Sequence, residues 1–133
     1  MNYKVLLVAG KVETFYMEAV AEYRKRLGRY CKTELIRIKN PSQLSKKISD
    51  KYFRIVISTK GQPISSEELA ERISSLALTG RSDVAVIIGA GEMECDVKIA
   101  IGPMEMDPGL MAVIVFEQIY RAYRIINSEP YHK

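Results

Sequence analysis

The end of the chain brings three kinds of chemistry together. Tyr131, His132 and Lys133 follow one another as the last three residues. An imidazole can accept or supply a proton near neutral pH, a tyrosine ring can stack on a nucleobase, and a lysine can contact a phosphate. The alternative interpretation is an ordinary frayed terminus. His132 is the only histidine, and the sequence supports no Ser/His/Asp or Cys/His arrangement for nucleophilic catalysis.

Two glycine-containing runs form a second group of candidate residues. Residues 89–91 (Gly-Ala-Gly) and 102–103 (Gly-Pro) each follow an apolar run. Small residues at strand ends let a ligand approach the backbone, and open α/β sheets bind ligands beyond the carboxyl ends of their strands. Neither run is a Walker loop or a GxGxxG fingerprint. From the residues alone, a ligand-binding role and a simple turn both remain open.

Composition restricts the class of protein. With 133 residues, 47% of them hydrophobic, the chain is long enough for one domain with its own core, so we expect a single domain over residues 1–133. Cys31 and Cys95 form no CxxC pair, which argues against a Cys/His zinc site and fits a reducing cytoplasm. The apolar run of residues 5–9 stops at Gly10, far short of a membrane span, and no signal-peptide pattern follows it.

The charge balance points weakly toward a nucleic-acid partner. Twenty Lys and Arg residues against sixteen Asp and Glu residues give a net charge of +4, with a pI near 9.1. Placement is more informative than the total. Residues 24–32 carry five cations and no acid, and residues 124–133 add further cations. A basic surface without any nucleic-acid partner is the competing interpretation.

The elements that must position these residues alternate along the chain. Apolar runs predict strands at residues 3–9, 33–39, 54–58, 83–88 and 97–101, the third of them bounded by Gly61 and Pro63. Helical periodicity predicts helices at residues 13–30, 65–80 and 109–127, with a short polar helix opening at Pro41. Residues 65–68 have the pattern of a capping box, and Gly80 suits a left-handed helix end. This alternation predicts an α/β fold with a largely parallel sheet.

The last predicted helix is apolar almost all the way round. Such a helix must be buried on two sides, and one sheet covers only one of them. In a chain this short, the second cover is expected to be another copy of the same helix in a twofold dimer. Coverage by neighbouring helices of the same chain is the alternative.

The sequence then shows a specific resemblance. Residues 116–133, which end in Pro130, Tyr131, His132 and Lys133, resemble the C-terminal signature of the RlmH family. Matching segments occur earlier at residues 8–11, 21–27, 60–61 and 65–70. The similarity therefore extends over essentially the whole chain.

The resemblance implies a SPOUT-class methyltransferase. Its fold would be an α/β knot, in which a trefoil-knotted, largely parallel sheet has helices on both faces and the protein is a homodimer with active sites at the subunit interface. The methyl donor would be S-adenosylmethionine. The acceptor would be N3 of a pseudouridine in 23S rRNA of the large subunit, read on the assembled ribosome in the cytoplasm, and no metal would be needed.

The same resemblance assigns site residues by motif. The cofactor would be held largely by backbone groups at Ile57, Gly89, Ala90, Gly102, Pro103, Met104, Glu105, Met106 and Asp107. Tyr131 and His132 would complete the active site of the partner subunit as its catalytic residues. The candidate contacts to RNA phosphates are Arg24, Arg26, Arg121, Arg124 and Lys133.

This chain departs from the family pattern around the expected cofactor loops. The family has a second glycine where this chain has Ala90, a third where it has Met93, a threonine at Glu105 and an arginine at Ala112, and the loop after Ala90 is shorter here. An acid added near the expected site, such as Glu105, repels RNA phosphate. Two other readings therefore remain, namely a knotted methyltransferase acting on a different RNA and a non-catalytic RNA-binding dimer.

The role of the imidazole has two versions at this stage. Methyl transfer from a sulfonium is an in-line displacement that depends mainly on positioning, and the acceptor nitrogen must lose a proton. His132 could accept that proton directly or through water. In the other version the proton is lost to solvent, and His132 only positions the nucleobase that is methylated.

Overall fold

The computed structural model describes residues 1–132. Its five strands are β1 (Asn2–Val8), β2 (Lys32–Ile38), β3 (Phe53–Pro63), β4 (Asp83–Ile88) and β5 (Val97–Ala100). The helices are α1 (Thr14–Leu27), α2 (Leu44–Lys47), α3 (Ser66–Leu78) and α4 (Pro108–Ile126), with a 3₁₀ turn at Pro41–Gln43 before α2. The strands form one sheet in the order β2-β1-β4-β3-β5, and every pairing is parallel. The predicted parallel α/β sheet is confirmed.

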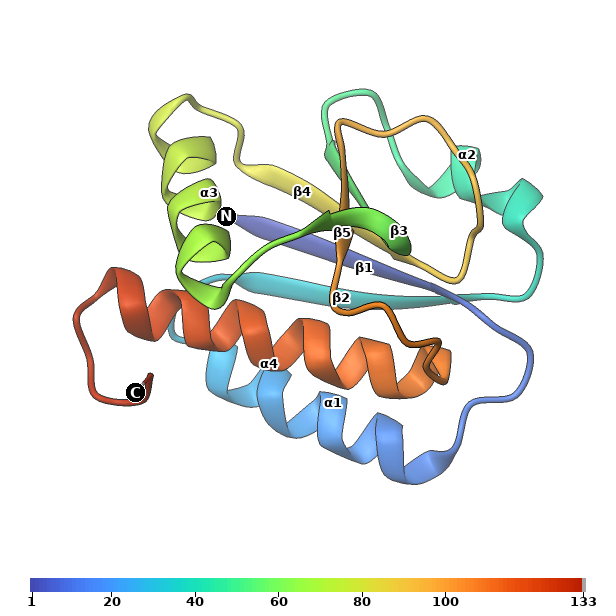
Figure 1. Cartoon of the computed structure of the whole chain (residues 1–133), viewed down its shortest axis with the longest axis horizontal. Helices are drawn as coiled ribbons and strands as arrows, with labels where there is room; N and C mark the ends of the chain where they lie inside the picture. The colour runs from blue at the N-terminus through green and yellow to red at the C-terminus, as the bar shows by residue number, and fades with distance from the viewer. Residues whose placement is uncertain (133) are drawn as a thin grey trace.

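The sheet has a thickly covered face and a thinly covered one. In Figure 1, α1 and α4 lie side by side along one face of the sheet, whereas α2 lies on the opposite side. Alternate residues of β1 follow this division: Val5 and Leu7 belong to the core under α1, α3 and α4, and Leu6 and Val8 to the core under α2. Helices on both faces were expected, and within residues 1–132 the helical cover of the second face consists of the 3₁₀ turn and the single turn of α2.

The third strand is longer than its sequence predicts. It continues through Gly61 to Pro63, because β3 pairs with β5 twice: Ile57 pairs with Ile99, and after an irregularity Gln62 pairs with Ile99 again. A Cβ added to Gly61 would lie 2.7 Å from the backbone N and C of Ile99. The glycine that suggests a turn in the sequence is therefore required by a close backbone crossing, and the predicted limit at residue 58 is wrong.

The ends of the third helix follow the sequence prediction. The hydroxyl of Ser65 accepts a hydrogen bond from the Glu68 amide at 3.1 Å, and the Glu68 carboxylate accepts one from the Ser65 amide at 2.9 Å. Gly80 has the left-handed φ of +80° that the sequence suggested. None of the helices within residues 1–132 is both long and apolar enough to cross a bilayer.

The end of β4 requires a glycine at residue 89. Gly89 has φ +81°, and an added Cβ would lie 2.3 Å from the carbonyl oxygen of Val8. We expect Gly89→Ala to lower the free energy of unfolding by about 3 kcal/mol, because left-handed strain and a backbone clash add together. Urea denaturation measures the change. Gly10→Ala is the control, since its Cβ would meet nothing within 4 Å, and equal midpoints for the two variants would contradict the prediction.

Candidate active site

The carboxyl edge of the sheet presents loops with available backbone groups. Register places Ile57 beside Ile88, so the part of β3 that pairs with β4 ends next to the start of the 89–91 loop. No backbone–backbone hydrogen bond joins residues 102–106 to the rest of the described chain. A Cβ at Gly102 would meet nothing within 4 Å. The 102–106 loop therefore has unused backbone donors and acceptors with open space beside them.

An apolar cavity of about 300 Å³ lies between the sheet, α3 and α4. Ile57, Ile99 and Ile101 line it near the carboxyl edge, and Ser66, Arg72 and Gln118 contribute polar groups. Ile57 is the one predicted cofactor residue among those that line the cavity. The structure therefore brings Ile57 to this cavity, while residues 102–107 follow the lining residue Ile101 and Ala90 packs against the core on the other face of the sheet.

The tail beyond α4 turns back through a Schellman motif. The Ser128 amide donates to the Ile125 carbonyl at 3.0 Å and the Glu129 amide to the Arg124 carbonyl at 2.8 Å, while Ser128 adopts φ +54°. The tail then folds against the end of the helix, as Figure 1 shows at the C-terminus. The tail predicted to carry chemistry is thus held in a defined turn through His132.

A serine is a poor residue for the left-handed position of this turn. We expect Ser128→Gly to raise the free energy of unfolding by about 1 kcal/mol, because glycine adopts positive φ without a Cβ penalty. Thermal denaturation would show the gain. The matched change Ser75→Gly, at an exposed position inside α3, should have the opposite sign, a loss of about 0.5 kcal/mol. A destabilised Ser128→Gly protein would contradict this account of the turn.

The first anchor of the tail is an ion pair beside an aromatic cluster. Arg124 NH1 lies 3.2 Å from Glu129 Oε2, and Arg124 NH2 donates to the Pro130 carbonyl at 2.8 Å. The Tyr30 hydroxyl donates to Glu129 Oε1 at 2.7 Å. These groups are only partly exposed, so the anchor is stronger than a surface pair.

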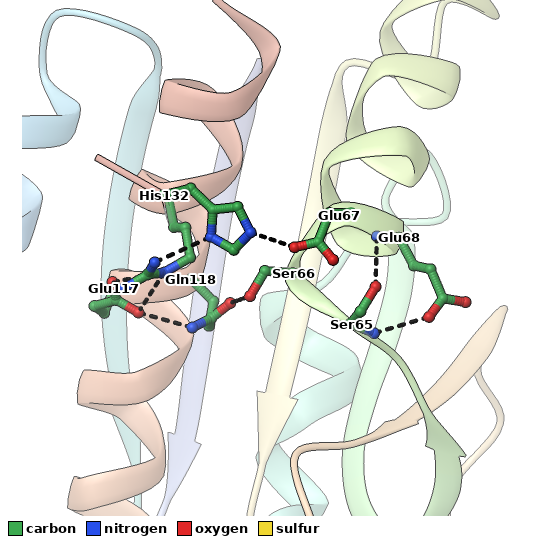
Figure 2. Close-up of polar contacts among 8 residues, drawn as sticks. Ser65, Ser66, Glu67, Glu68, Glu117, Gln118 and His132 are labelled. Atoms are coloured by element: carbon green, nitrogen blue, oxygen red, sulfur yellow. Dashed lines mark hydrogen bonds and ion pairs between the residues drawn. The ribbon is translucent and has the colours of Figure 1, made fainter. Parts of the chain in front are cut away.

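The second anchor holds the tail between α4 and α3. His132 hydrogen-bonds Glu67 through Nε2, and its Nδ1 lies 3.1 Å from NH1 of Arg121. Arg121 also pairs with Glu117 at 3.0 Å, and Glu117 accepts a hydrogen bond from the Tyr131 hydroxyl at 2.8 Å. Figure 2 shows the His132 ring bridging the space between Glu117 on one helix and Glu67 on the other.

Two acid–base equilibria support this arrangement. Burial, reinforced by the Glu117 carboxylate, raises the pKa of the Tyr131 hydroxyl, which therefore stays protonated and acts as a donor. The hydrogen bond from His132 lowers the pKa of the Glu67 carboxyl, which keeps this acceptor ionised.

The predicted RNA-binding arginines already have partners within the chain. Arg24 NH2 donates to the Thr33 carbonyl at 2.8 Å, and Arg26 pairs with Glu22 at 3.1 Å. Arg121 and Arg124 hold the tail, as described above. Lys133, the remaining candidate, lies outside the described residues.

Three acids that hold the tail are absent from the sequence-based assignment. They are Glu67, Glu117 and Glu129. Glu117 could have been recognised from its i,i+4 spacing to Arg121. No comparable signal connects Glu67 to His132, because 65 residues separate them.

Comparison with known proteins decides the family. A family model described as "Predicted SPOUT methyltransferase" matches residues 1–132. This chain belongs to the SPOUT methyltransferase family. The resemblance to RlmH proteins is confirmed as well, because relatives with that name match over the full length of the chain.

The RlmH relatives of this SPOUT chain differ in length. "Ribosomal RNA large subunit methyltransferase H 1" of Thermoanaerobacter sp. (strain X514) is 50% identical over 133 residues, covering all of both chains. "Ribosomal RNA large subunit methyltransferase H" of Limosilactobacillus reuteri (strain DSM 20016) is 36% identical, again over all of both chains, but that alignment spans 159 positions. The Bifidobacterium adolescentis protein of the same name is 36% identical over 155 positions, covering 96% of this chain and 98% of that protein. The Thermoanaerobacter relative thus aligns with this chain over its full 133 residues, whereas the other two alignments are longer than this chain.

In this SPOUT methyltransferase the candidate site is divided along α4. The 102–107 loop precedes α4, whereas Arg121, which holds His132, lies fourteen residues beyond Asp107. At 1.5 Å per residue that is about 20 Å along the helix. The 102–107 loop and the tail of one chain are therefore well separated.

Within residues 1–132 no group of three or more His, Cys, Asp or Glu side chains could hold a metal ion.

Proposed function

We propose that this protein is an S-adenosylmethionine-dependent rRNA methyltransferase that methylates N3 of a pseudouridine in 23S rRNA on the assembled ribosome, in the cytoplasm. The observation that carries the proposal is the 50% identity, over all of both chains, to a protein named ribosomal RNA large subunit methyltransferase H 1. The family model describes methyltransferases. The acceptor nucleotide is the more specific part of the proposal.

The carboxyl-edge loops suit the proposed donor. Unpaired backbone groups of residues 102–106 and the space beside Gly102 allow a ligand close to the main chain. Ile57 and Ile101 offer apolar walls for a nucleobase. Glu105 adds a carboxylate, which favours a cationic sulfonium nearby. Ile57, Gly89, Ala90 and residues 102–107 would hold the donor mainly through their backbone.

We also propose that residues 1–133 form one domain containing a trefoil knot. The support is the tight crossing at Gly61, where the extension of β3 passes over the backbone of Ile99 in β5. The chain leaves β5 directly after this crossing and enters the 101–107 loop before α4. Threading at this point would bring the three predicted donor segments together.

The working form in this proposal is a homodimer. About 20 Å of α4 separates the 102–107 loop from the residues that hold the tail. Two α4 helices packed in opposite directions about a twofold axis would place the tail of one chain at the donor loops of the other. Partly buried apolar residues on α4, including Met111 and Val113, support such packing. Tyr131 and His132 would then complete the partner's site.

The mechanism follows from positioning. When bound, the donor would supply a methyl group to N3 and remain as S-adenosylhomocysteine, and the N3 proton would pass to His132 or to solvent. The carboxyl-edge loops orient the donor, and the tail places the acceptor nucleobase in line with it.

Arg26, 47% exposed and paired only at the surface, can exchange Glu22 for a phosphate. Arg24 and Lys133 are proposed as further phosphate contacts. Arg121 and Arg124, which lie in α4, contact RNA only if they exchange their contacts with the tail for a phosphate.

Titration of the purified protein with S-adenosylmethionine in a calorimeter tests the donor proposal. Saturable 1:1 binding per chain is expected, and no measurable binding would favour the non-catalytic RNA-binding dimer.

Methylation of intact ribosomes, free 23S rRNA and tRNA is then compared. Transfer to ribosomes alone supports the proposed substrate, whereas transfer to tRNA would indicate a knotted methyltransferase for another RNA. Light scattering during gel filtration reports the oligomeric state, and a monomer would overturn the dimer.

A further inference from the structure

The environment of His132 restricts the proton that its ring can carry. Nδ1 lies 3.1 Å from NH1 of Arg121. A guanidinium has only N–H donors and remains charged in proteins, so the nitrogen that faces it must offer a lone pair. Nδ1 is therefore the unprotonated nitrogen of the ring.

The opposite nitrogen faces an acceptor. Nε2 hydrogen-bonds the carboxylate of Glu67, whose pKa is lowered by this same contact so that it remains an acceptor. One neutral tautomer, with hydrogen on Nε2 and a lone pair on Nδ1, satisfies both contacts. While both partners stay in place, the ring has no free lone pair with which to accept a proton from a substrate.

We propose that Glu67 is a positioning residue that fixes His132 as the neutral Nε2–H tautomer, so that His132 orders the tail at the reaction centre and does not serve as the base. The tautomer of His132 is argued from its contacts alone, and only its role in methyl transfer rests on the proposed function. The N3 proton of the acceptor then leaves to solvent, and the rate of its loss depends on how the tail places the nucleobase.

The remaining charged groups around the ring agree with this role. Glu117 neutralises the other side of the Arg121 guanidinium at 3.0 Å, and the Tyr131 hydroxyl donates to the same carboxylate. Gln118 joins the network through Glu117 and Ser66, at 2.8 and 2.6 Å. The hydrogen-bonded groups thus run from Glu67 in α3 through His132 in the tail to α4. The His132 side chain, 25% exposed, has a fixed place in this network.

Because His132 is the only histidine, one measurement reads its tautomer directly. Nitrogen-15 NMR of the imidazole in the full-length protein without donor or RNA should show a single Nε2–H tautomer between pH 7 and 8. Glu67→Ala should give a mixture of tautomers, and Glu71→Ala, on the exposed next turn of α3, should leave the spectrum unchanged. A protonated Nδ1 in the unmodified protein would overturn the proposal, whether or not the protein methylates rRNA.

Activity separates a positioning role from a base. Glutamine can accept from Arg121 and donate to Glu67 but cannot take up a proton, so His132→Gln should turn over at least about tenfold faster than His132→Ala, with the pH profile of the unmodified enzyme. Glu67→Ala should lose about tenfold in kcat with KM little changed, and Glu67→Gln, which keeps an acceptor for Nε2–H, should recover most of that loss. A His132→Gln enzyme as slow as His132→Ala would show that the ring acts as the base.

Discussion

A Gly102→Val protein is expected to fold normally and to bind S-adenosylmethionine about 100-fold more weakly than the unmodified protein. The Cβ position at Gly102 meets nothing within 4 Å and the residue has no positive φ, so valine fits the fold without strain. Its methyl groups would fill the space beside the backbone at which the donor is proposed to bind. A 100-fold loss corresponds to about 2.7 kcal/mol of binding free energy.

Calorimetric titration measures this affinity, and circular dichroism confirms the fold. Gly10→Val is the matched control, because its Cβ is equally unobstructed and it lies outside the proposed donor residues. The control should bind the donor like the unmodified protein. Full affinity in Gly102→Val would place the donor elsewhere.

The second large effect is expected at the tail. His132→Ala should reduce methyl transfer by about 100-fold, because its loss releases the tail from Glu67 and Arg121 and misplaces the reacting base. Donor affinity should change by less than about twofold, since within residues 1–132 the hydrogen bonds of His132 go to Arg121 and Glu67, and the proposed donor contacts are mostly backbone. Single-turnover assays on ribosomes and donor titration measure the two quantities. Equal losses in both would place the tail in the donor pocket instead.

These two variants together test whether the site is shared between subunits. In a heterodimer of Gly102→Val and His132→Ala chains, one site combines an intact loop with an intact tail, and the other carries both defects. Random assembly of a 1:1 mixture should therefore recover about a quarter of the unmodified activity, although each variant alone is nearly inactive. No recovery by co-expressed chains would mean that each site uses the loop and tail of a single chain.

The candidate site was predictable wherever it depends on strand ends. In a parallel sheet all carboxyl ends meet at one edge, so Gly89 and Gly102 could be grouped from the order of elements before their positions were known, whereas Ile57 was assigned from the family resemblance. The chemistry of the tail was recognised from residue types alone. The partners of the tail were not, because hydrogen bonds such as those of Glu67 and Glu129 depend on how α3 and α1 pack beside α4.

The arginines illustrate the same limit. A run of cations predicts a basic surface, yet Arg24 donates to a strand carbonyl, and Arg124 secures the tail. Counting charges along the chain cannot distinguish a cation that is free for RNA from one already paired, because the pairing acid or carbonyl comes from a distant segment.

The sequence by itself determined the elements of this protein. Apolar strands, the capping box at Ser65 and the left-handed end at Gly80 are local features, and they depend on residues within a few positions of one another. Tertiary structure alone decided that β3 continues through Gly61 against Ile99, and that His132 lies between Arg121 and Glu67. Both outcomes depend on contacts between segments far apart in the chain, whose geometry is set by packing and not by local propensity.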